Sequence, residues 1–313
     1  MSRVTQAIKS SPSPAGPLVL AVVVNWNRCE ETLACLRSLE RQTYPHLGII
    51  VVDNGSQDGS PDAVQRNFPR VDLVRLSRNR GFAGGYNRGI ERALARGGDS
   101  ILIINNDTVA DQQMVEKLVE NLQSGTGMVF PKIYYHDDPR RIWSVGARRQ
   151  PLTLEMTDQA TGQLDRGQWD RIQERDYATG CALLVQREVF EKVGLFDERY
   201  FAYYEDMDFS FRVREAGWRI ILVPEARLWH KVARTSGGLD SPRERYLMAK
   251  GSVLFFSSHG GRRLFFIVPY RIGSALKTTG RLLARFKFKS VQAYWHGLGD
   301  GLKTVRQNTR KSV

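Results

Sequence analysis

The sequence predicts an α/β fold built on a doubly wound, mostly parallel sheet. In residues 18–122 of the 313-residue chain, four short apolar runs alternate with four segments whose apolar residues recur at helical spacing. The first run, residues 18–24, is continuously apolar and rich in Val, which is typical of a parallel strand buried on both faces. In such a fold the functional crevice lies beyond the carboxyl ends of the strands.

The apolar pattern also sets the expected boundaries. Strands are expected at residues 18–24, 49–52, 71–76 and 101–104, and helices at residues 31–42, 61–68, 84–96 and 111–122. Residues 132–177 have little helical periodicity and contain short β-like pieces such as 141–145, so they predict an irregular insert. Toward the end of the chain, helices are expected at residues 246–257 and 262–288, the second interrupted at Pro269.

The positive charge of the chain is concentrated in its last quarter. The formal net charge is +13 at pH 7, and residues 241–313 hold fifteen Lys or Arg and two acidic residues. These basic residues alternate with apolar and aromatic ones, but no run approaches the roughly 20 apolar residues that span a bilayer. The pattern favours an element lying on an anionic membrane surface over a nucleic-acid patch or an ordinary packed basic domain.

The chain therefore divides into three predicted parts. They are a disordered leader over residues 1–17, an α/β domain over residues 18–240, and a basic, helical C-terminal region over residues 241–313. Residues 1–17 lack the apolar core of a secretory signal. Cys29, Cys35 and Cys181 form an odd, sparse set without metal-ligand spacing, which is typical of a reduced, intracellular protein.

Polar residues and glycines follow each of the four predicted strands. They are Asn25, Trp26 and Asn27 after the first strand, residues 53–60 after the second, residues 79–87 after the third, and Asn105, Asn106 and Asp107 after the fourth. Any one of these segments could be an ordinary turn. Four of them opening onto one rim indicate a ligand site.

Each rim segment has a chemical use. Asp53 could accept a hydrogen bond from the ring N–H of a nucleobase. Gly81, with the glycines that follow it, would let the backbone approach a diphosphate, although the dinucleotide fingerprint and the Walker A loop are both absent. Asp107 is suited to a hard divalent cation, and its alternative role is to cap the helix that follows.

A second acidic cluster lies at residues 203–212. If this segment is helical, Glu205 and Asp208 share one face, Arg212 can pair with Asp208, and Asp206 points elsewhere. A carboxylate left free beside aromatic residues suits a general base. The alternative is a helix start whose acidic residues only favour the helix dipole.

Six motifs in order resemble glycosyltransferase family 2, particularly its rhamnosyltransferase-like branch. They are VVVNWN, VVDNGSQDGS, NRGFAGGYNRGI, ILIINNDT, the long segment from TGCALLVQ to REAGW, and LWH, and together they span about residues 18–240. The resemblance implies a GT-A fold, a nucleotide-sugar donor, a divalent cation (Mg²⁺ or Mn²⁺) and an inverting displacement at the anomeric carbon.

The resemblance also assigns roles to individual residues. Asp53 resembles the aspartate that contacts the nucleobase, and residues 105–107 match the metal-binding DXD motif, with Asn105 in place of the first aspartate. Glu205 and Asp206 match the catalytic ED pair, in which Asp206 is similar to the base, and His230 resembles a histidine that completes the metal site. The predicted nucleotide-sugar-binding set is Asn25, Asn27, Asp53, Gly81, Asn87, Asn105 and Asn106.

We therefore predict an inverting glycosyltransferase at the inner face of the cell membrane, peripheral and cytoplasmic. By the resemblance, its donor is a dTDP- or UDP-sugar, with rhamnose the first choice, and its acceptor is a hydroxyl of a polysaccharide or lipid-linked glycan. No nucleic-acid partner is expected. The alternatives are a nucleotidyltransferase, which would carry a Gly-rich basic loop where Asn25, Trp26 and Asn27 stand, and a non-catalytic nucleotide-binding scaffold.

Overall fold

The computed structural model describes residues 16–232 and 240–311, and its first half follows the predicted strand–helix alternation. The strands are β1 (Val19–Asn25), β2 (Leu47–Asp53), β3 (Asp72–Arg75) and β4 (Ser100–Asn105). The helices are α1 (Cys29–Glu40), α2 (Ser60–Asn67), α3 (Gly81–Ala95) and α4 (Met114–Glu120). All eight predictions are confirmed, because each boundary lies within three residues of the expected one.

The second half adds shorter elements and completes the sheet. These are β5 (Thr108–Ala110), β6 (Thr126–Tyr135), β7 (Ile142–Ser144), β8 (Arg148–Arg149), β9 (Met156–Thr157), β10 (Gln173–Arg175), β11 (Ala182–Gln186), α5 (Arg187–Val193), α6 (Glu205–Glu215) and β12 (Arg219–His230). The main sheet has the order β10-β12-β6-β11-β4-β1-β2-β3. Strands β4, β1, β2 and β3 are parallel, whereas β11 runs antiparallel to both β4 and β6. The predicted α/β class is confirmed, with a mixed sheet.

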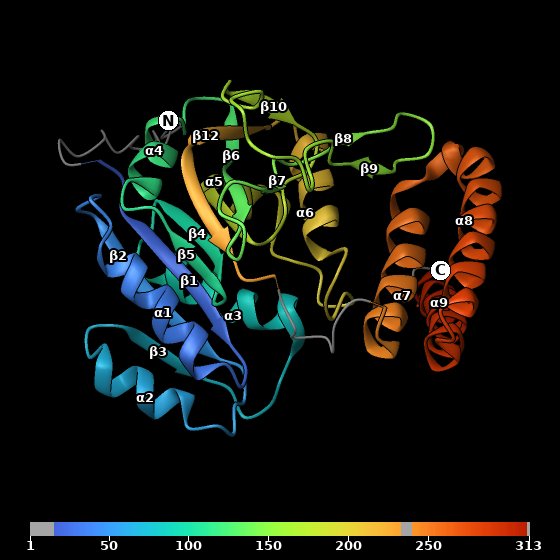
Figure 1. The fold of residues 1–313 in the computed structure, drawn as a ribbon, viewed down its shortest axis with the longest axis horizontal. Coiled ribbons are helices and arrows are strands. Elements are labelled where there is room, and N and C mark those ends of the chain that lie inside the picture. The colour runs from blue at the N-terminus through green and yellow to red at the C-terminus, as the bar shows by residue number, and fades with distance from the viewer. Residues whose placement is uncertain (1–15, 233–239, 312–313) are drawn as a thin grey trace, which may run out of the picture.

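Helices cover both faces of this sheet (Figure 1). Side chains of β1 alternate between the faces: Val19, Ala21 and Val23 pack with α1, α2 and α4, while Leu20 and Val22 pack with α3, α5 and α6. This burial on both faces explains the continuous apolar run in the sequence. The alternation leaves functional side chains only at the strand ends.

Glycines of α3 allow this helix to lie directly on the sheet. A Cβ at Gly89 would stand 2.1 Å from Val22 Cγ1, so only glycine permits the approach. Gly81 has φ +78°, and a Cβ there would stand 2.2 Å from the Phe201 carbonyl oxygen. Gly81 therefore has a structural use, because its missing side chain makes room for protein backbone; its predicted role in donor binding stays a prediction.

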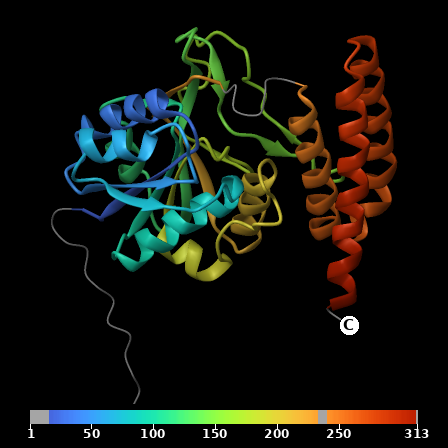
Figure 2. The same cartoon turned by 90° about the horizontal axis from the view of Figure 1, so that it is seen from below.

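The C-terminal region is helical, as predicted, and lies beside the α/β domain (Figure 2). It contains α7 (Pro242–His259), a short 3₁₀ turn (Gly261–Arg263), α8 (Leu264–Ala284) and α9 (Phe288–Lys311). The predicted interruption at Pro269 is wrong, because α8 continues through it. A proline in the second turn removes one backbone hydrogen bond, toward residue 265, and the rest of the helix keeps its ladder. The break comes at residues 285–287, where Phe286 has φ +54°.

Across the described residues, no helix has the length and apolar content needed to cross a bilayer. The predicted leader at residues 1–17 falls mostly outside the described part of the chain.

Candidate active site

The ends of β1 and β2 hold one connected group of polar side chains. Asn25 and Asp53 are neighbours in the parallel register, and Asn25 Nδ2 donates to Asp53 Oδ1 at 3.2 Å. The Ser56 amide donates to Asp53 Oδ2 at 3.1 Å. Asp53 is only 3% exposed, so these bonds fix its carboxylate at the rim. Each carboxylate oxygen has two lone pairs, so capacity to accept from a ligand N–H remains.

This polar group extends to the fourth strand and to Asn27. Thr32 donates to Asn25 Oδ1 at 2.7 Å, and Asn106 Nδ2 donates to Thr32 Oγ1 at 2.9 Å. Asn27, which has φ +53°, accepts from the Gln57 amide at 2.7 Å. The loops after β1, β2 and β4 are therefore joined by side-chain hydrogen bonds.

Asp107 and His230 form a second cluster. Strands β5 and β12 pair antiparallel, so that His230 lies opposite Thr108, the residue after Asp107. Asp107 Oδ1 lies 3.1 Å from His230 Nε2. Both atoms are buried; they lie at ion-pair distance, yet neither makes a hydrogen bond. Burial alone would lower the pKa of His230, but the adjoining Cys181 and Asp107 raise it to about 10.

These two orphaned atoms fit a divalent cation. Two adjacent ligands at about 2.1 Å from an octahedral ion lie about 3 Å apart, which matches the separation of the carboxylate oxygen and the imidazole nitrogen. Within residues 16–232 and 240–311, no group of three or more His, Cys, Asp or Glu side chains is placed to hold a metal. A cation here would take the rest of its shell from a ligand and water.

The predicted base stands at the start of α6. Asp206 is half-buried, and its Oδ2 accepts hydrogen bonds from Tyr177 Oη and the Gly180 amide, both at 2.9 Å. The Met207 amide donates to Oδ1 at 2.8 Å. Burial raises the pKa of Asp206 and these hydrogen bonds oppose the rise, so the carboxylate is held ready to take a proton.

Glu205 differs from its neighbour. It is 4% exposed and its Oε2 has no partner. Burial, and then the charge of Asp206, raise the pKa of Glu205 well above its usual range. The larger rise in the pKa of Glu205 favours its neutral form over that of Asp206, so Asp206 is the better placed of the two to carry a negative charge. On the same helix, the predicted ion pair between Asp208 and Arg212 is confirmed, since Arg212 Nε donates to Asp208 Oδ2 at 2.8 Å.

The segment at Gly180 and Cys181 brings the two clusters together. The Gly180 amide binds Asp206, and the next residue, Cys181, lies against His230, whose positive charge lowers the thiol pKa that burial raises. Charge on Asp107 and on Asp206 also acts on this thiol. The candidate cation site and the candidate base therefore lie around one short segment that leads into β11.

Two predicted ligand-binding residues, Asn87 and Asn105, make structural contacts within the protein, and their predicted ligand roles stay predictions. Asn87 is 4% exposed, accepts from the Phe196 amide at 3.0 Å and donates to the Phe196 carbonyl at 2.9 Å. Its amide is occupied in holding that loop. The Asn105 side chain accepts from Tyr86 Oη at 3.1 Å, which fixes the end of β4.

Sequence reasoning missed Tyr177, Thr32 and Arg243. The Arg243 guanidinium, at the start of α7, lies 5.4 Å from the ring centre of Trp26 and 5.6 Å from that of Phe201. Nothing in the local pattern marks these residues, because each acts through a contact with a distant part of the chain.

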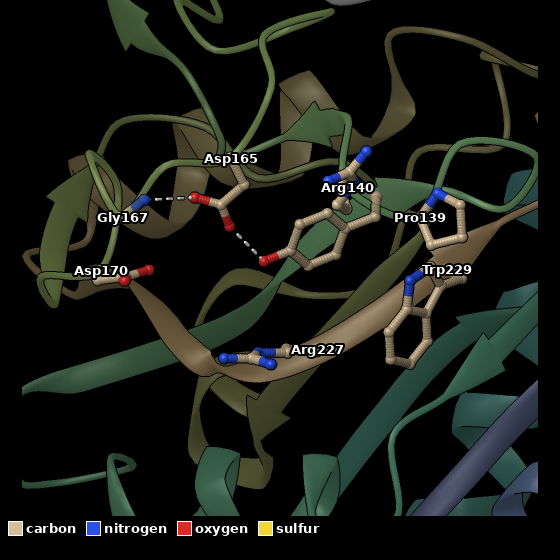
Figure 3. Close-up of a pocket in the computed structure, with 8 residues that line it drawn as sticks. Pro139, Arg140, Asp165, Gly167, Asp170, Arg227 and Trp229 are labelled. Atoms are coloured by element: carbon tan, nitrogen blue, oxygen red, sulfur yellow. Dashed lines mark hydrogen bonds between the residues drawn. The ribbon is translucent and has the colours of Figure 1, made fainter.

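A pocket of about 240 Å³ opens near Trp229, which is next to His230 in β12 (Figure 3). Its walls include Arg140, Arg227 and the Asp165 carboxylate. Successive strand residues point to opposite faces, so this pocket and His230 lie on opposite sides of β12. The pocket is therefore separate from the cluster around Cys181.

Comparisons with known proteins agree with this geometry. A family model described as "Glycosyl transferase family 2" matches residues 20–194. An N-acetylglucosaminyl-diphospho-decaprenol L-rhamnosyltransferase of Mycobacterium tuberculosis is 27% identical over 237 residues, covering 64% of this chain and 72% of that protein. The dTDP-rhamnosyl transferase RfbF of Shigella flexneri is 22% identical over 244 residues, covering 75% and 79%.

Two solved structures share the fold. A mannosyltransferase of Pyrobaculum calidifontis, in complex with GDP-Man and Mn²⁺, aligns with a TM-score of 0.57 at 18% identity, covering 98% of this chain and 84% of that one. GalNAc-T7, crystallised with UDP, GalNAc and Mn²⁺, aligns with a TM-score of 0.58 at 15% identity, covering 77% and 48%. At these identities the likeness concerns the fold, which is GT-A.

Proposed function

The chain belongs to glycosyl transferase family 2, and from that premise we propose that it moves a sugar from a nucleoside-diphosphate donor to an acceptor hydroxyl with inversion. The observation that carries this proposal is the meeting of Asp107, His230 and Asp206 around Cys181. We propose rhamnose as the sugar, with dTDP or UDP as the carrier, because the relatives named above include rhamnosyltransferases.

In this proposal the donor nucleotide binds at the ends of β1 and β2. Asp53, held by Asn25 and the Ser56 amide, accepts a hydrogen bond from the ring N–H of the base. Asn27 and Asn106 shape the loops beside it. These contacts are preorganised because the side chains bond to one another.

Asp107 and His230 would hold the divalent cation, Mg²⁺ or Mn²⁺, of this proposal. Such an ion, when bound, neutralises the negative charge that collects on the departing nucleoside diphosphate. Asp107 would supply a carboxylate and His230 an imidazole nitrogen, whose proton the cation would displace on binding. The lack of a hydrogen-bond partner for either atom supports this assignment. With one carboxylate in place of the two of a DXD motif, the protein would leave most of the ion's ligand positions to the donor and to water.

Asp206 acts as the general base. An acceptor hydroxyl is a poor nucleophile, and the Asp206 carboxylate takes its proton as the oxygen attacks the anomeric carbon. The carboxylate keeps its position because Tyr177 and the Gly180 amide hold one of its oxygens. A single base on the face opposite the leaving group gives inversion.

The test is a transfer assay with dTDP-rhamnose, UDP-GlcNAc and GDP-mannose, with or without Mn²⁺, on a polyprenyl-diphosphate-linked GlcNAc acceptor. We expect one donor to yield a glycoside of inverted anomeric configuration, together with a nucleoside diphosphate. Release of pyrophosphate would instead support a nucleotidyltransferase. Donor binding without any turnover would support the scaffold alternative.

We also propose that the enzyme works as a peripheral protein on the inner face of the cell membrane, where a lipid-linked acceptor is presented. This proposal uses the predicted division into a leader over residues 1–17, a transferase domain over residues 18–240 and a helical region over residues 241–313.

A further inference from the structure

The outer face of α8 carries a line of exposed apolar side chains. Phe265 is 79% exposed, Ile272 59%, Leu276 62% and Leu283 44%. Their spacings of seven, four and seven residues place all four on one side of the helix. We propose that this line, here called the α8 face, is the membrane-contact surface of the enzyme and that an anionic bilayer covers it.

The α8 face is directed away from the catalytic domain. Helix α7 stands between most of α8 and the sheet of the domain (Figures 1 and 2). Ile267, Ala275 and Leu282 of α8 are buried, and helical spacing places them on a different side of α8 from the exposed line. The exposed line runs about 27 Å, because the eighteen helical steps from Phe265 to Leu283 rise about 1.5 Å each. Contiguous apolar surface of this kind is uncommon on soluble monomers and marks a contact site.

Aromatic residues extend the α8 face at its end. Phe286 is 80% exposed and Phe288 is 61% exposed, at the turn between α8 and α9. Half-exposed Tyr270 on α8 and Trp295 on α9 are of the types that collect at membrane interfaces. An amphipathic helix with such residues lies in the plane of the interface and does not cross it.

The basic residues near α8 fall into two groups. Arg281 and Arg285 bind the buried Asp240, and Arg271 binds Glu155, so these three cations stabilise the fold. A second group is exposed and has no carboxylate partner among the described residues; it consists of Arg262, Arg263, Lys277 and Lys289. Each exposed cation attracts anionic lipid by about 1 kcal/mol near the surface.

This division of the charges indicates what covers the α8 face. A second copy of the chain would have to place its own exposed cations against these four. An anionic bilayer matches both features, because acyl chains accept the apolar line and lipid phosphates accept the flanking cations. The charge of +13 in the sequence overstates the attraction, since Arg271, Arg281 and Arg285 are paired with carboxylates of the protein.

The α8 face is also fixed relative to the active site. His259 at the end of α7 bonds to Asp208 at 2.7 Å, one turn beyond the ED pair on α6. Tyr204, which precedes that pair, packs against Phe255 and Phe256 of α7. A bilayer bound to α8 would therefore hold the catalytic cleft at a set height above the lipid surface.

The experiment uses the full chain and vesicles of 7:3 phosphatidylcholine and phosphatidylglycerol, compared with pure phosphatidylcholine, in 0.1 M salt. We expect the wild type to float with anionic vesicles and much less with neutral ones. The double variant Ile272→Glu, Leu276→Glu should bind anionic vesicles at least tenfold more weakly. Leu302→Glu on α9, also 50% exposed, is the matched control and should bind like the wild type.

Three results would overturn the proposal. They are failure of the wild type to bind anionic vesicles, equal binding by the double variant and the control, and a wild-type dimer in solution that the double variant converts to a monomer. The last result would assign the α8 face to a second copy. Transfer to a short water-soluble acceptor, measured in parallel, should be unchanged in the double variant, so the outcome is independent of the proposed chemistry.

Discussion

Replacing Asp206 with Asn should lower turnover by about two to four orders of magnitude while leaving donor affinity nearly unchanged. General-base catalysis contributes factors of this size, which correspond to about 2.7–5.4 kcal/mol at the transition state. The donor contacts assigned to Asp53 and Asp107 are not altered by this substitution. The assay is steady-state transfer, with donor affinity measured separately by calorimetry.

The same substitution has a structural cost that can be worked out from its hydrogen bonds. Asp206 accepts from the Gly180 amide at one oxygen and from the Met207 amide at the other. The single oxygen of Asn can serve only one of these amides, so the other faces an NH₂ group. An unsatisfied buried donor costs about 1–3 kcal/mol, which should appear as reduced unfolding free energy.

Tyr177→Phe separates the two effects. It removes one hydrogen bond to the Asp206 carboxylate but leaves the base in place. Losing that bond should raise the pKa of Asp206 further and move the acidic limb of the pH–rate profile to higher pH, with less than about a tenfold loss of turnover at its optimum. Full activity in Asp206→Asn, or a loss in Tyr177→Phe equal to that in Asp206→Asn, would refute the assignment of the base.

Three further changes test the surrounding structure. Asp240→Asn should cost about 1–3 kcal/mol at pH 7, because it removes a buried carboxylate that accepts charge-assisted hydrogen bonds from the partly exposed Arg281 and Arg285. Burial alone would raise the pKa of Asp240, but Arg281 and other cations lower it. The stabilisation that charged Asp240 gives the folded state is therefore complete above its unfolded-state pKa, near about 4, and is lost as pH falls through its pKa in the folded state. Denaturant titrations of the wild type and the variant should converge in acid. Arg243→Ala should raise the KM for donor several-fold with little change in kcat, since its guanidinium lies over Trp26 beside Asn25; an unchanged KM would remove it from the donor site. Gly89→Ala should destabilise the fold by about 1–3 kcal/mol through overpacking against β1, and thermal unfolding with no shift would contradict the close approach of α3.

The core of the fold could be predicted from the sequence because its signal is local. The apolar run of β1 and the helical spacing of α1 each reflect burial of consecutive residues, and the residues that end β1, β2 and β4 meet because parallel strands share one rim. Asp53, Asp107 and Asp206 were recognised for this reason and through the resemblance. Their roles as ligand-binding residues remain proposals.

The sequence could not predict features that depend on distant contacts. Gly81 is required because the Phe201 carbonyl packs against it, and Asn87 is occupied because the loop at Phe196 returns to α3. No local pattern distinguishes these uses from ligand binding. Likewise, the breaking effect of Pro269 depends on its position within α8, which the sequence did not fix.

The division of the basic C-terminal residues is a further example. Composition shows their number, but only the packing shows that Asp240 neutralises some of them and leaves others exposed. The same packing makes α7 part of the support for α6, through His259 and Asp208. A chain ending at residue 240 would lose these contacts, so membrane binding is better tested with surface variants of the full chain.

The most direct test of the account is anomalous diffraction from crystals of the enzyme with Mn²⁺ and a nucleoside diphosphate. The account predicts a manganese peak bound by Asp107 Oδ1 and His230 Nε2, with the diphosphate completing its shell and the Asp206 carboxylate facing the same cleft. A peak elsewhere, or an ion held without Asp107, would contradict it.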